Sequence, residues 1–287
     1  MKLKDIQKVF HEELEAIYDK NEIDSFFFML TEHYYKVPRI KLAVNPNYSI
    51  DNEDYILEAL KCLKQEQPIQ YIIGETEFYG LLFKVNRHVL IPRPETEELV
   101  EWIVENSETA GKNEFKILDI GTGSGCIAIS LAKNLPNAKV YALDVSKEAL
   151  QVAKRNAELN DVDVELLNDD ILNPDESIFK DLKFDIIVSN PPYVRDKEKA
   201  LMKINVLNNE PHLALFVKDE NPLQFYDAIT VFSVENLKKE GMLFFEINEY
   251  LGDDMIDLLS KNSFSEIELK QDIFKKDRMI KGLRVDF

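Results

Sequence analysis

Two short segments contain residue types that suit chemistry on a bound ligand. In residues 117–125 an apolar stretch leads into the run Gly121, Thr122, Gly123, Ser124 and Gly125. In residues 184–193 a second apolar stretch leads into Asn190, Pro191, Pro192 and Tyr193. Alternating glycines can adopt positive φ and let the backbone approach a ligand closely. An amide, two rigid prolines and an aromatic ring can form a clamp, so we expect a cofactor loop and a substrate clamp at the ends of neighbouring strands.

The spacing of the glycine loop favours S-adenosyl-L-methionine over a dinucleotide. Dinucleotide-binding loops keep their third glycine three positions after the second, with pyrophosphate on the helix N-terminus. Here Gly125 comes two positions after Gly123, and Asp119 stands two residues before Gly121. A carboxylate there would repel a pyrophosphate, but it suits a cofactor whose amino acid and sulfonium both carry positive charge. We therefore predict S-adenosyl-L-methionine as the cofactor.

Acidic residues after the next two predicted strands provide further cofactor contacts. The stretch 139–143 ends in Asp144, and an acid at this place in a doubly wound sheet accepts hydrogen bonds from ribose hydroxyls. After the stretch 164–167, we expect Asp170 to lie near the adenine amine and Ile171 to pack on the ring. A solvated loop carboxylate or a helix N-cap is the alternative for each acid.

The second segment can orient a planar NH₂ group for methyl transfer. An amide nitrogen is a poor nucleophile and must be held in line with the sulfonium methyl at near-attack distance. The side-chain oxygen of Asn190 and the backbone carbonyl of Pro191 can each accept one N–H, and Tyr193 offers a face for a planar amide or base. Accepting both protons favours positive charge on the nitrogen, so we predict catalysis without a general base. The alternative is a strand terminator, since proline removes a ladder donor.

Longer segments give the chain a family resemblance. It resembles the release factor glutamine methyltransferases, a family of protein-(glutamine-N5) methyltransferases. The shared segments are residues 67–74, 77–80, 89–97 and 210–215, with Asp272, Ile273, Arg278 and Gly282. The resemblance runs from residue 67 onward, and residues 90–97 are its most specific part because methyltransferases in general lack them.

The resemblance implies a substrate and a set of site residues. The substrate is the glutamine of the Gly-Gly-Gln motif in class I peptide-chain release factors, methylated on its side-chain amide nitrogen. The implied cofactor-binding residues are Gly121, Thr122, Gly123, Ser124, Gly125, Asp144, Ile171 and Asn190. The implied substrate-binding residues are Asn190, Pro191, Pro192 and Tyr193, of which Asn190 and Pro191 are our predicted catalytic pair. Arg93 and Glu95 are implied to pack beside the cofactor, with a structural role in domain docking as the alternative.

The chain departs from the family pattern at two places. Many members have an aromatic residue where Ile171 stands, so plain apolar contact would replace stacking on the adenine. Members also tend to have a paired glycine within residues 216–219, which here read Phe-Val-Lys-Asp. The second departure leaves the conformation of that loop open.

The elements that must position these residues read as an α/β fold with two parts. Residues 1–75 show helical periodicity and no convincing strand, which predicts an N-terminal helical domain; the resemblance implies that it recognises the substrate, and a stabilising cap is the alternative. Residues 76–92 suit a β-hairpin linker. Residues 93–287 alternate helices with apolar strands, the pattern of a Rossmann-like class I methyltransferase sheet, mostly parallel. Late strands are expected at 241–247, around 266–269 and at 279–285.

Charge favours a protein substrate over nucleic acid. The formal net charge is −18, and both residues 1–75 and the remainder are net acidic. Binding duplex DNA requires a basic face that displaces counterions from phosphates. Because adenine-specific DNA methyltransferases use a similar clamp on a flipped base, methylation of an exocyclic amine of a nucleic-acid base is the alternative function. A binding module without chemistry is disfavoured because Asn190, Pro191 and Pro192 are all present.

The rest of the composition argues against a disulfide-bonded, metal-binding, membrane or secreted protein. Cys62 and Cys126 lie on separate predicted domains, which indicates reduced thiols rather than a disulfide. The scattered histidines and two cysteines show no ligand spacing, so no metal is expected. We expect no membrane span and no signal peptide. These features predict a cytoplasmic protein, monomeric, with no DNA or membrane partner.

Overall fold

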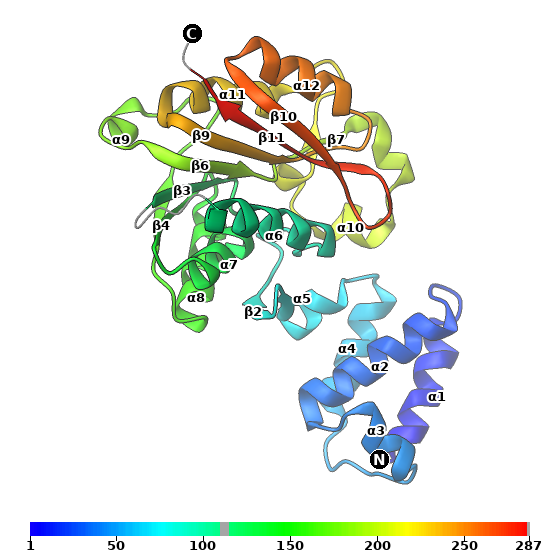
Figure 1. Ribbon diagram of the computed structural model, residues 1–287. Helices are drawn as coiled ribbons and strands as arrows, with labels where there is room; N and C mark the ends of the chain where they lie inside the picture. Colours follow the sequence, from blue (N-terminus) through cyan, green and yellow to red (C-terminus); the bar gives the residue numbers. More distant parts are fainter. Residues whose placement is uncertain (110–114, 286–287) are drawn as a thin grey trace. The chain divides into compact units, whose positions relative to one another are not determined.

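The computed structural model describes residues 1–109 and 115–285, which form two compact units (Figure 1). The first unit comprises Met1–Gly74 and Lys203–Asn209. The second comprises the described residues of Glu75–Met202 and Glu210–Phe287. The chain therefore leaves the second unit once, packs a short segment with the first, and returns.

The first unit is helical, as the periodicity of residues 1–75 predicts. Its helices are α1 (Leu3–Leu14), α2 (Lys20–Tyr35), α3 (Arg39–Val44), α4 (Asp54–Lys64), α5 (Ile69–Ile73) and, from the returning segment, α10 (Ile204–Asn209). Helix α1 buries Leu3, Ile6, Phe10 and Leu14, which share one face at helical spacing. Asn209 joins α10 to the rest of the unit, because its side-chain nitrogen donates to the carbonyl of Glu66 at 3.2 Å.

A β-hairpin opens the second unit. Strands β1 (Glu75–Phe78) and β2 (Leu81–Lys84) pair antiparallel across a turn in which Tyr79 and Gly80 have φ of 49° and 71°. Two consecutive left-handed residues match the twist of a two-residue hairpin. Asn156 secures the hairpin: its side-chain oxygen accepts from the Lys84 N–H at 2.7 Å, and its nitrogen donates to the Lys84 carbonyl at 3.0 Å.

A seven-stranded sheet forms the centre of the second unit. Its strands are β3 (Phe115–Ile120), β4 (Ala138–Asp144), β5 (Val164–Asn168), β6 (Phe184–Ser189), β9 (Leu237–Glu246), β10 (Phe264–Gln271) and β11 (Asp277–Arg284), in the order β10-β11-β9-β6-β3-β4-β5. Strands β5, β4, β3, β6 and β9 pair parallel, and β11 pairs antiparallel with β9 and β10. The predicted Rossmann-like sheet, including its late strands, is confirmed.

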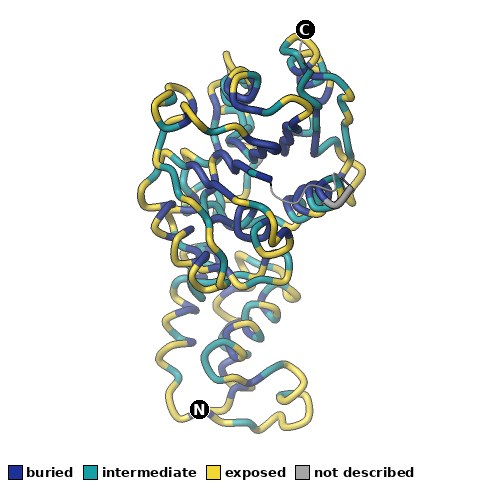
Figure 2. The backbone as a smooth tube through the Cα atoms, turned by 60° about the vertical axis from the view of Figure 1, so that its left-hand side comes forward, coloured by how far each residue is buried: buried dark blue, intermediate teal, exposed yellow. Residues whose placement is uncertain are grey.

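Helices cover both faces of this sheet because its strands are apolar on both sides. One face carries α6 (Pro94–Thr109), α7 (Cys126–Asn134) and α8 (Lys147–Leu159); the other carries α9 (Glu176–Phe179), α11 (Gln224–Asn236) and α12 (Gly252–Lys261). Successive strand residues alternate between the two cores: Ile186 packs in one and Ile187 in the other. All of β6 is buried, and Figure 2 shows buried backbone through the centre of the sheet.

The segment after the clamp contains a small second pairing. Strands β7 (Val194–Arg195) and β8 (Phe216–Val217) pair parallel, with two 3₁₀ turns, η1 (Asp196–Leu201) and η2 (His212–Ala214), between them in sequence. The Lys197 N–H donates to Asp219 at 3.2 Å. The loop that lacks the paired glycine is thus held as strand backbone beside the residues that follow Tyr193.

Candidate active site

The strands that carry the two predicted segments end in register. Ile120 on β3 pairs with Leu143 on β4 and with Ser189 on β6, and Ser189 pairs with Phe245 on β9. Because these strands are parallel, the residues that follow their ends share one edge of the sheet. Gly121 and Asn190 follow β3 and β6 at this edge, and Asp144 and Glu246 are the last residues of β4 and β9.

A cavity of about 230 Å³ opens at this edge within the second unit. Its walls come from residues 87–90, 92–93, 120–124, 143–146, 169–171 and 189–192, with Thr96 of α6 and further residues from α7, α8, the η2 region and α11. Of the predicted cofactor residues, the cavity brings together Gly121, Thr122, Gly123, Ser124, Asp144, Asp170, Ile171 and Asn190. Pro191 and Pro192 also line it, whereas Gly125 and Tyr193 are not among its lining residues.

The glycines of the loop have two different tasks. Gly121, Gly123 and Gly125 have φ of 75°, 56° and 81°, values that L side chains rarely adopt. A Cβ on Gly121 or Gly123 would meet no atom within 4 Å, so the loop leaves open space on the cavity side. A Cβ on Gly125 would lie 2.8 Å from Ile129 Cδ1 and 3.2 Å from Ala153 Cβ. Gly125 therefore permits close packing of α7 and α8 rather than contact with a ligand.

Asp144 holds the glycine loop and faces the cavity. Its Oδ2 accepts from the Gly123 N–H at 2.8 Å, and its Oδ1 accepts from the Ser146 N–H at 2.9 Å. Burial raises the pKa of Asp144, and these backbone hydrogen bonds oppose the rise. A carboxylate oxygen can accept a second hydrogen bond, so Asp144 can also accept from hydroxyls of a ligand.

Asp119, two residues before Gly121, lies behind the glycine loop. It is fully buried, does not line the cavity, and its Oδ2 accepts from the Thr122 hydroxyl at 2.6 Å. Strand alternation is the reason, because it turns Asp119 toward the sheet face that α7 covers. Burial raises the pKa of Asp119 to about 7, and the nearby charge of Asp144 adds to the rise. The carboxyl therefore supports the loop through Oδ2, while its buried Oδ1 has no hydrogen-bond partner within the described residues. Its interaction with the positive charge of the cofactor stays a prediction.

The loop after β5 supplies another part of the cavity wall. Asp170 and Ile171 both line the cavity. Asp170 Oδ1 also accepts from the Leu172 N–H at 3.0 Å, which fixes the turn. Ile171 is 8% exposed and packs into the core on the α11 side. This loop offers one acidic and one apolar surface to a ligand.

The clamp places an amide at the end of β6. The Asn190 side-chain nitrogen donates to the hydroxyl of Thr96 on α6 at 3.3 Å, so its Oδ1 is the atom left to accept from a substrate. Tyr193 turns away from the cavity lining, and its hydroxyl donates to Glu246 Oε1 at 3.1 Å. The stacking role expected for Tyr193 stays a prediction.

Sequence reasoning missed Glu246, a buried carboxylate behind the clamp. Thr96 donates its hydroxyl to Glu246 Oε2 at 2.6 Å, and both residues are 2% exposed. Burial raises the pKa of Glu246, while Thr96, Arg278 and Tyr193 act in the opposite direction. The available signal was an acid in the apolar stretch 241–247, at the point where the strand ends.

The specific segment 90–97 lies against the cavity. Arg93 lines it and pairs with Glu210, Nη2 to Oε1, at 2.6 Å. Glu210 is 3% exposed, and its other oxygen accepts from the Ile91 N–H at 3.2 Å. Glu95 is not a lining residue. Arg93 thus joins the cavity wall to the residues before η2.

Other features of the described chain bear on the class of site. Within residues 1–109 and 115–285 no group of three histidines, cysteines or acids is arranged to hold a metal ion. No helix in this part of the chain is long and apolar enough to cross a membrane. Cys62 and Cys126 are free thiols, and burial raises the pKa of Cys126 to about 12.

The fold and the cavity define a class of protein. A mostly parallel sheet with a glycine loop after its first strand, an acid at the end of the next and Asn-Pro-Pro-Tyr after the fourth is that of an S-adenosyl-L-methionine-dependent methyltransferase. A family model described as "Methyltransferase small domain" matches residues 96–215. The catalytic domain of human Mettl16, solved with an RNA hairpin, shares the fold at a TM-score of 0.54 and 18% identity, covering 73% of this chain and 77% of that one.

Sequence relatives narrow the class to a family. The chain is 51% identical to a release factor glutamine methyltransferase of Flavobacterium psychrophilum over 98% of this chain and 99% of the relative. It is 37% identical to that of Streptococcus pneumoniae over 98% of each. The chain belongs to the release factor glutamine methyltransferase family.

Proposed function

We propose that this protein transfers a methyl group from S-adenosyl-L-methionine to the side-chain amide nitrogen of the glutamine in the Gly-Gly-Gln motif of class I peptide-chain release factors. One observation carries the proposal: Asn190, with its nitrogen engaged by Thr96, shares a cavity with the glycine loop of the adjacent strand. The family relatives, named for this reaction, support it.

The residues of the cavity fit the cofactor. Gly121 and Gly123 leave space that side chains would fill, and Asp144 has lone pairs for the ribose hydroxyls. Ile171 offers an apolar surface for the adenine, with Asp170 beside it. When bound, S-adenosyl-L-methionine supplies an electrophilic methyl group. We propose that the loop residues 121–124 hold it, with Gly125 acting through helix packing.

The clamp supplies orientation and electrostatic stabilisation. Asn190 Oδ1 and the Pro191 carbonyl each accept one N–H of the glutamine amide, which fixes the plane of the NH₂ group. Both acceptors favour positive charge on the nitrogen as the new bond forms. Pro192 holds the backbone rigid. Tyr193 supports the clamp from outside the cavity lining, through its hydrogen bond to Glu246. No general base is assigned.

The alternative acceptor is an exocyclic amine of a nucleic-acid base, which would use the same two oxygens. It is disfavoured by the net charge of −18, because phosphate binding needs a basic surface. Methyl transfer from labelled cofactor separates the two acceptors. We expect label in an intact release factor, none in the same factor with the Gly-Gly-Gln glutamine changed to alanine, and none in DNA or RNA. Label in nucleic acid and not in the release factor would establish the alternative.

The helical unit is proposed to recognise the release factor. Helix α3 exposes Ile40 and Val44, one turn apart, at 70% and 81%. Exposed apolar side chains on one helix face are typical of surfaces that bind a protein partner. We also propose that the protein acts in the cytoplasm, where its substrate serves translation, and as a monomer, since residues of one chain form the cavity.

A further inference from the structure

Three side chains from three elements connect the clamp to a buried carboxylate. The Asn190 nitrogen, after β6, donates to the Thr96 hydroxyl of α6 at 3.3 Å. The Thr96 hydroxyl donates to Glu246 Oε2, at the end of β9, at 2.6 Å. Thr96 and Glu246 are buried and are not part of the predicted substrate clamp, although Thr96 lines the cavity and Glu246 does not.

We propose that Thr96 and Glu246 are positioning residues that set the direction of the Asn190 amide, so that its oxygen and not its nitrogen faces the substrate. The proposal rests on the proposed function, in which Asn190 Oδ1 accepts an N–H of the glutamine. It adds to that function a means by which the protein selects one of two nearly isosteric amide orientations.

The numbers of hydrogen bonds that Thr96 and Glu246 can donate and accept determine which end of the Asn190 amide faces Thr96. A hydroxyl has one proton to donate, and an ionised carboxylate can only accept. Once Thr96 gives its proton to Glu246, its oxygen can only accept from Asn190. The group of Asn190 beside Thr96 must then be its NH₂, which leaves Oδ1 for the substrate. If the Asn190 amide were reversed, its NH₂ group would face the NH₂ group of the substrate glutamine, and neither group could accept a hydrogen bond.

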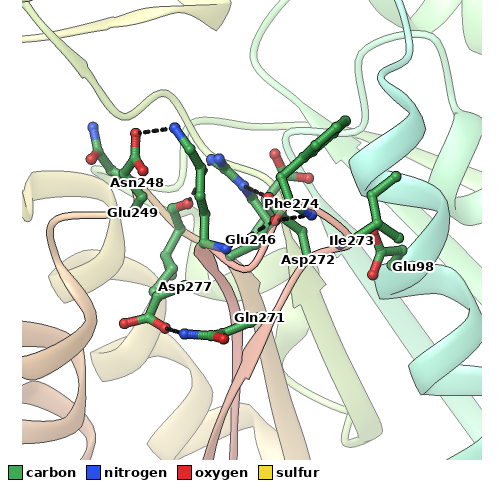
Figure 3. Close-up of polar contacts among 12 residues, drawn as sticks. Glu98, Glu246, Asn248, Glu249, Gln271, Asp272, Ile273, Phe274 and Asp277 are labelled. Atoms are coloured by element: carbon green, nitrogen blue, oxygen red, sulfur yellow. Dashed lines mark hydrogen bonds and ion pairs between the residues drawn. The ribbon is translucent and has the colours of Figure 1, made fainter.

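The surroundings of Glu246 keep it an acceptor. The Tyr193 hydroxyl donates to its Oε1 at 3.1 Å, so both carboxylate oxygens accept from a hydroxyl. Burial raises the pKa of Glu246, and the charge of Arg278 opposes that rise. Arg278 is itself fixed, since its Nε donates to Asp272 Oδ2 at 3.1 Å. Asp272 is anchored by the N–H groups of Phe274 and Lys276 at 2.9 and 3.1 Å (Figure 3). Glu246 therefore has partners on both oxygens and a compensating cation.

Thr96 is fixed from its own helix as well. The Ile273 N–H, in the turn after β10, donates to Glu98 Oε1 on α6 at 3.1 Å (Figure 3). The same turn that anchors Arg278 thus holds the first turns of α6. The turn between β10 and β11 therefore contacts the helix that carries Thr96 and holds the cation that faces Glu246.

The test compares Thr96→Val, which keeps the shape and removes the hydroxyl, with Thr96→Ser, which keeps the hydroxyl. Methyl transfer to an intact release factor and calorimetric cofactor binding are measured on the full chain. We expect kcat to fall about 10- to 100-fold in Thr96→Val, the loss typical of a misplaced reacting group. We expect cofactor Kd to stay within about twofold and Thr96→Ser to restore most of kcat. Full kcat in Thr96→Val, or equal losses in both variants, would overturn the proposal.

A second readout separates this proposal from the proposed function. In protein labelled with ¹⁵N at asparagine side chains, hydrogen exchange of the Asn190 NH₂ needs no substrate. We expect slow exchange in wild type and Thr96→Ser, and faster exchange in Thr96→Val; equal exchange in all three would defeat the positioning role even if release factor is methylated.

Should Thr96→Val fail to fold, Glu246→Gln serves instead, since its amide can donate to Thr96 and permit the reversed orientation. It should lower kcat without weakening cofactor binding, and an unchanged kcat would count against the proposal.

Discussion

The Ser189 hydroxyl, at the end of β6, donates to the backbone carbonyl of Ile120, at the end of β3, at 2.7 Å. The two residues are also register partners in the sheet. Each immediately precedes one of the two functional segments, the glycine loop and the clamp. Their contact therefore joins the start of the glycine loop to the start of the clamp in a buried part of the sheet.

Replacing Asn190 with alanine should separate chemistry from cofactor binding. The substitution removes one of two proposed acceptors for the NH₂ protons, so we expect kcat to fall at least about 100-fold, as when one preorganised electrostatic partner is lost. Cofactor Kd, measured by calorimetry, should change little. Asn262→Ala, at the end of α12, is the matched control and should behave as wild type. Comparable losses in turnover and in cofactor affinity for Asn190→Ala would contradict this division.

Substituting Gly125 should mainly lower stability, whereas substituting Gly121 should mainly weaken cofactor binding. Gly125→Ala combines a left-handed φ of 81° with a Cβ 2.8 Å from Ile129, so urea unfolding should show a loss of about 3 kcal/mol. Gly121→Ala carries only the backbone strain, about 1–2 kcal/mol. Because its Cβ would enter the cavity, Gly121→Ala should weaken cofactor binding more than Gly125→Ala does. The reverse order in either measurement would refute the assignment.

Asp119 should make stability depend on pH in a particular direction. Burial raises its pKa from 3.8 to about 7, so the folded state binds this proton more tightly than the unfolded state does. Its contribution is present below the unfolded pKa and is lost as pH rises to about 7. At about 1.4 kcal/mol per unit, the loss is on the order of 4 kcal/mol. Denaturant unfolding across this window should therefore show a flatter profile for Asp119→Asn, which still accepts from Thr122; parallel profiles would show that Asp119 does not titrate there.

Ile171→Phe should tighten cofactor binding. The family departure at this position replaces a ring with an aliphatic side chain, and stacking of aromatic planes adds about 0.5–1.5 kcal/mol. We expect Kd to fall about three- to tenfold in calorimetry, with Ile171→Leu as the volume-matched control without a ring. A similar gain from leucine would mean that apolar contact alone is responsible, and weaker binding by a stably folded Phe variant would place the adenine elsewhere.

Substitutions on the exposed face of α3 should weaken activity on the intact release factor and not on a short peptide. Ile40→Ser with Val44→Ser removes the apolar surface that we assign to the release factor, so KM for the whole factor should rise about tenfold or more. Activity on a short Gly-Gly-Gln peptide should stay unchanged, because the peptide reaches only the cavity. Val231→Ser, at a 51% exposed position on α11, is the control. An unchanged KM for the whole factor would assign α3 to another purpose.

Local patterns predicted most of the fold and the cavity lining, and long-range contacts account for what they missed. The strand 184–189 and the residues after it could be read directly, because period and turn residues are local. The bond between Thr96 and Glu246 joins residues far apart in sequence, so no local pattern indicates it. The burial of Asp119 under α7 was not predicted, because spacing alone does not tell which face of a strand a helix covers. The return of α10 to the first unit has no compositional signal either.

Fragmentation mass spectrometry of a release factor after incubation with this protein and S-adenosyl-L-methionine tests the central claim most directly. The account predicts one added methyl group, on the side-chain nitrogen of the Gly-Gly-Gln glutamine, and none when Asn190→Ala replaces the wild type. A methyl group on another residue of the factor, or an unmodified glutamine under conditions where the cofactor is bound, would contradict it.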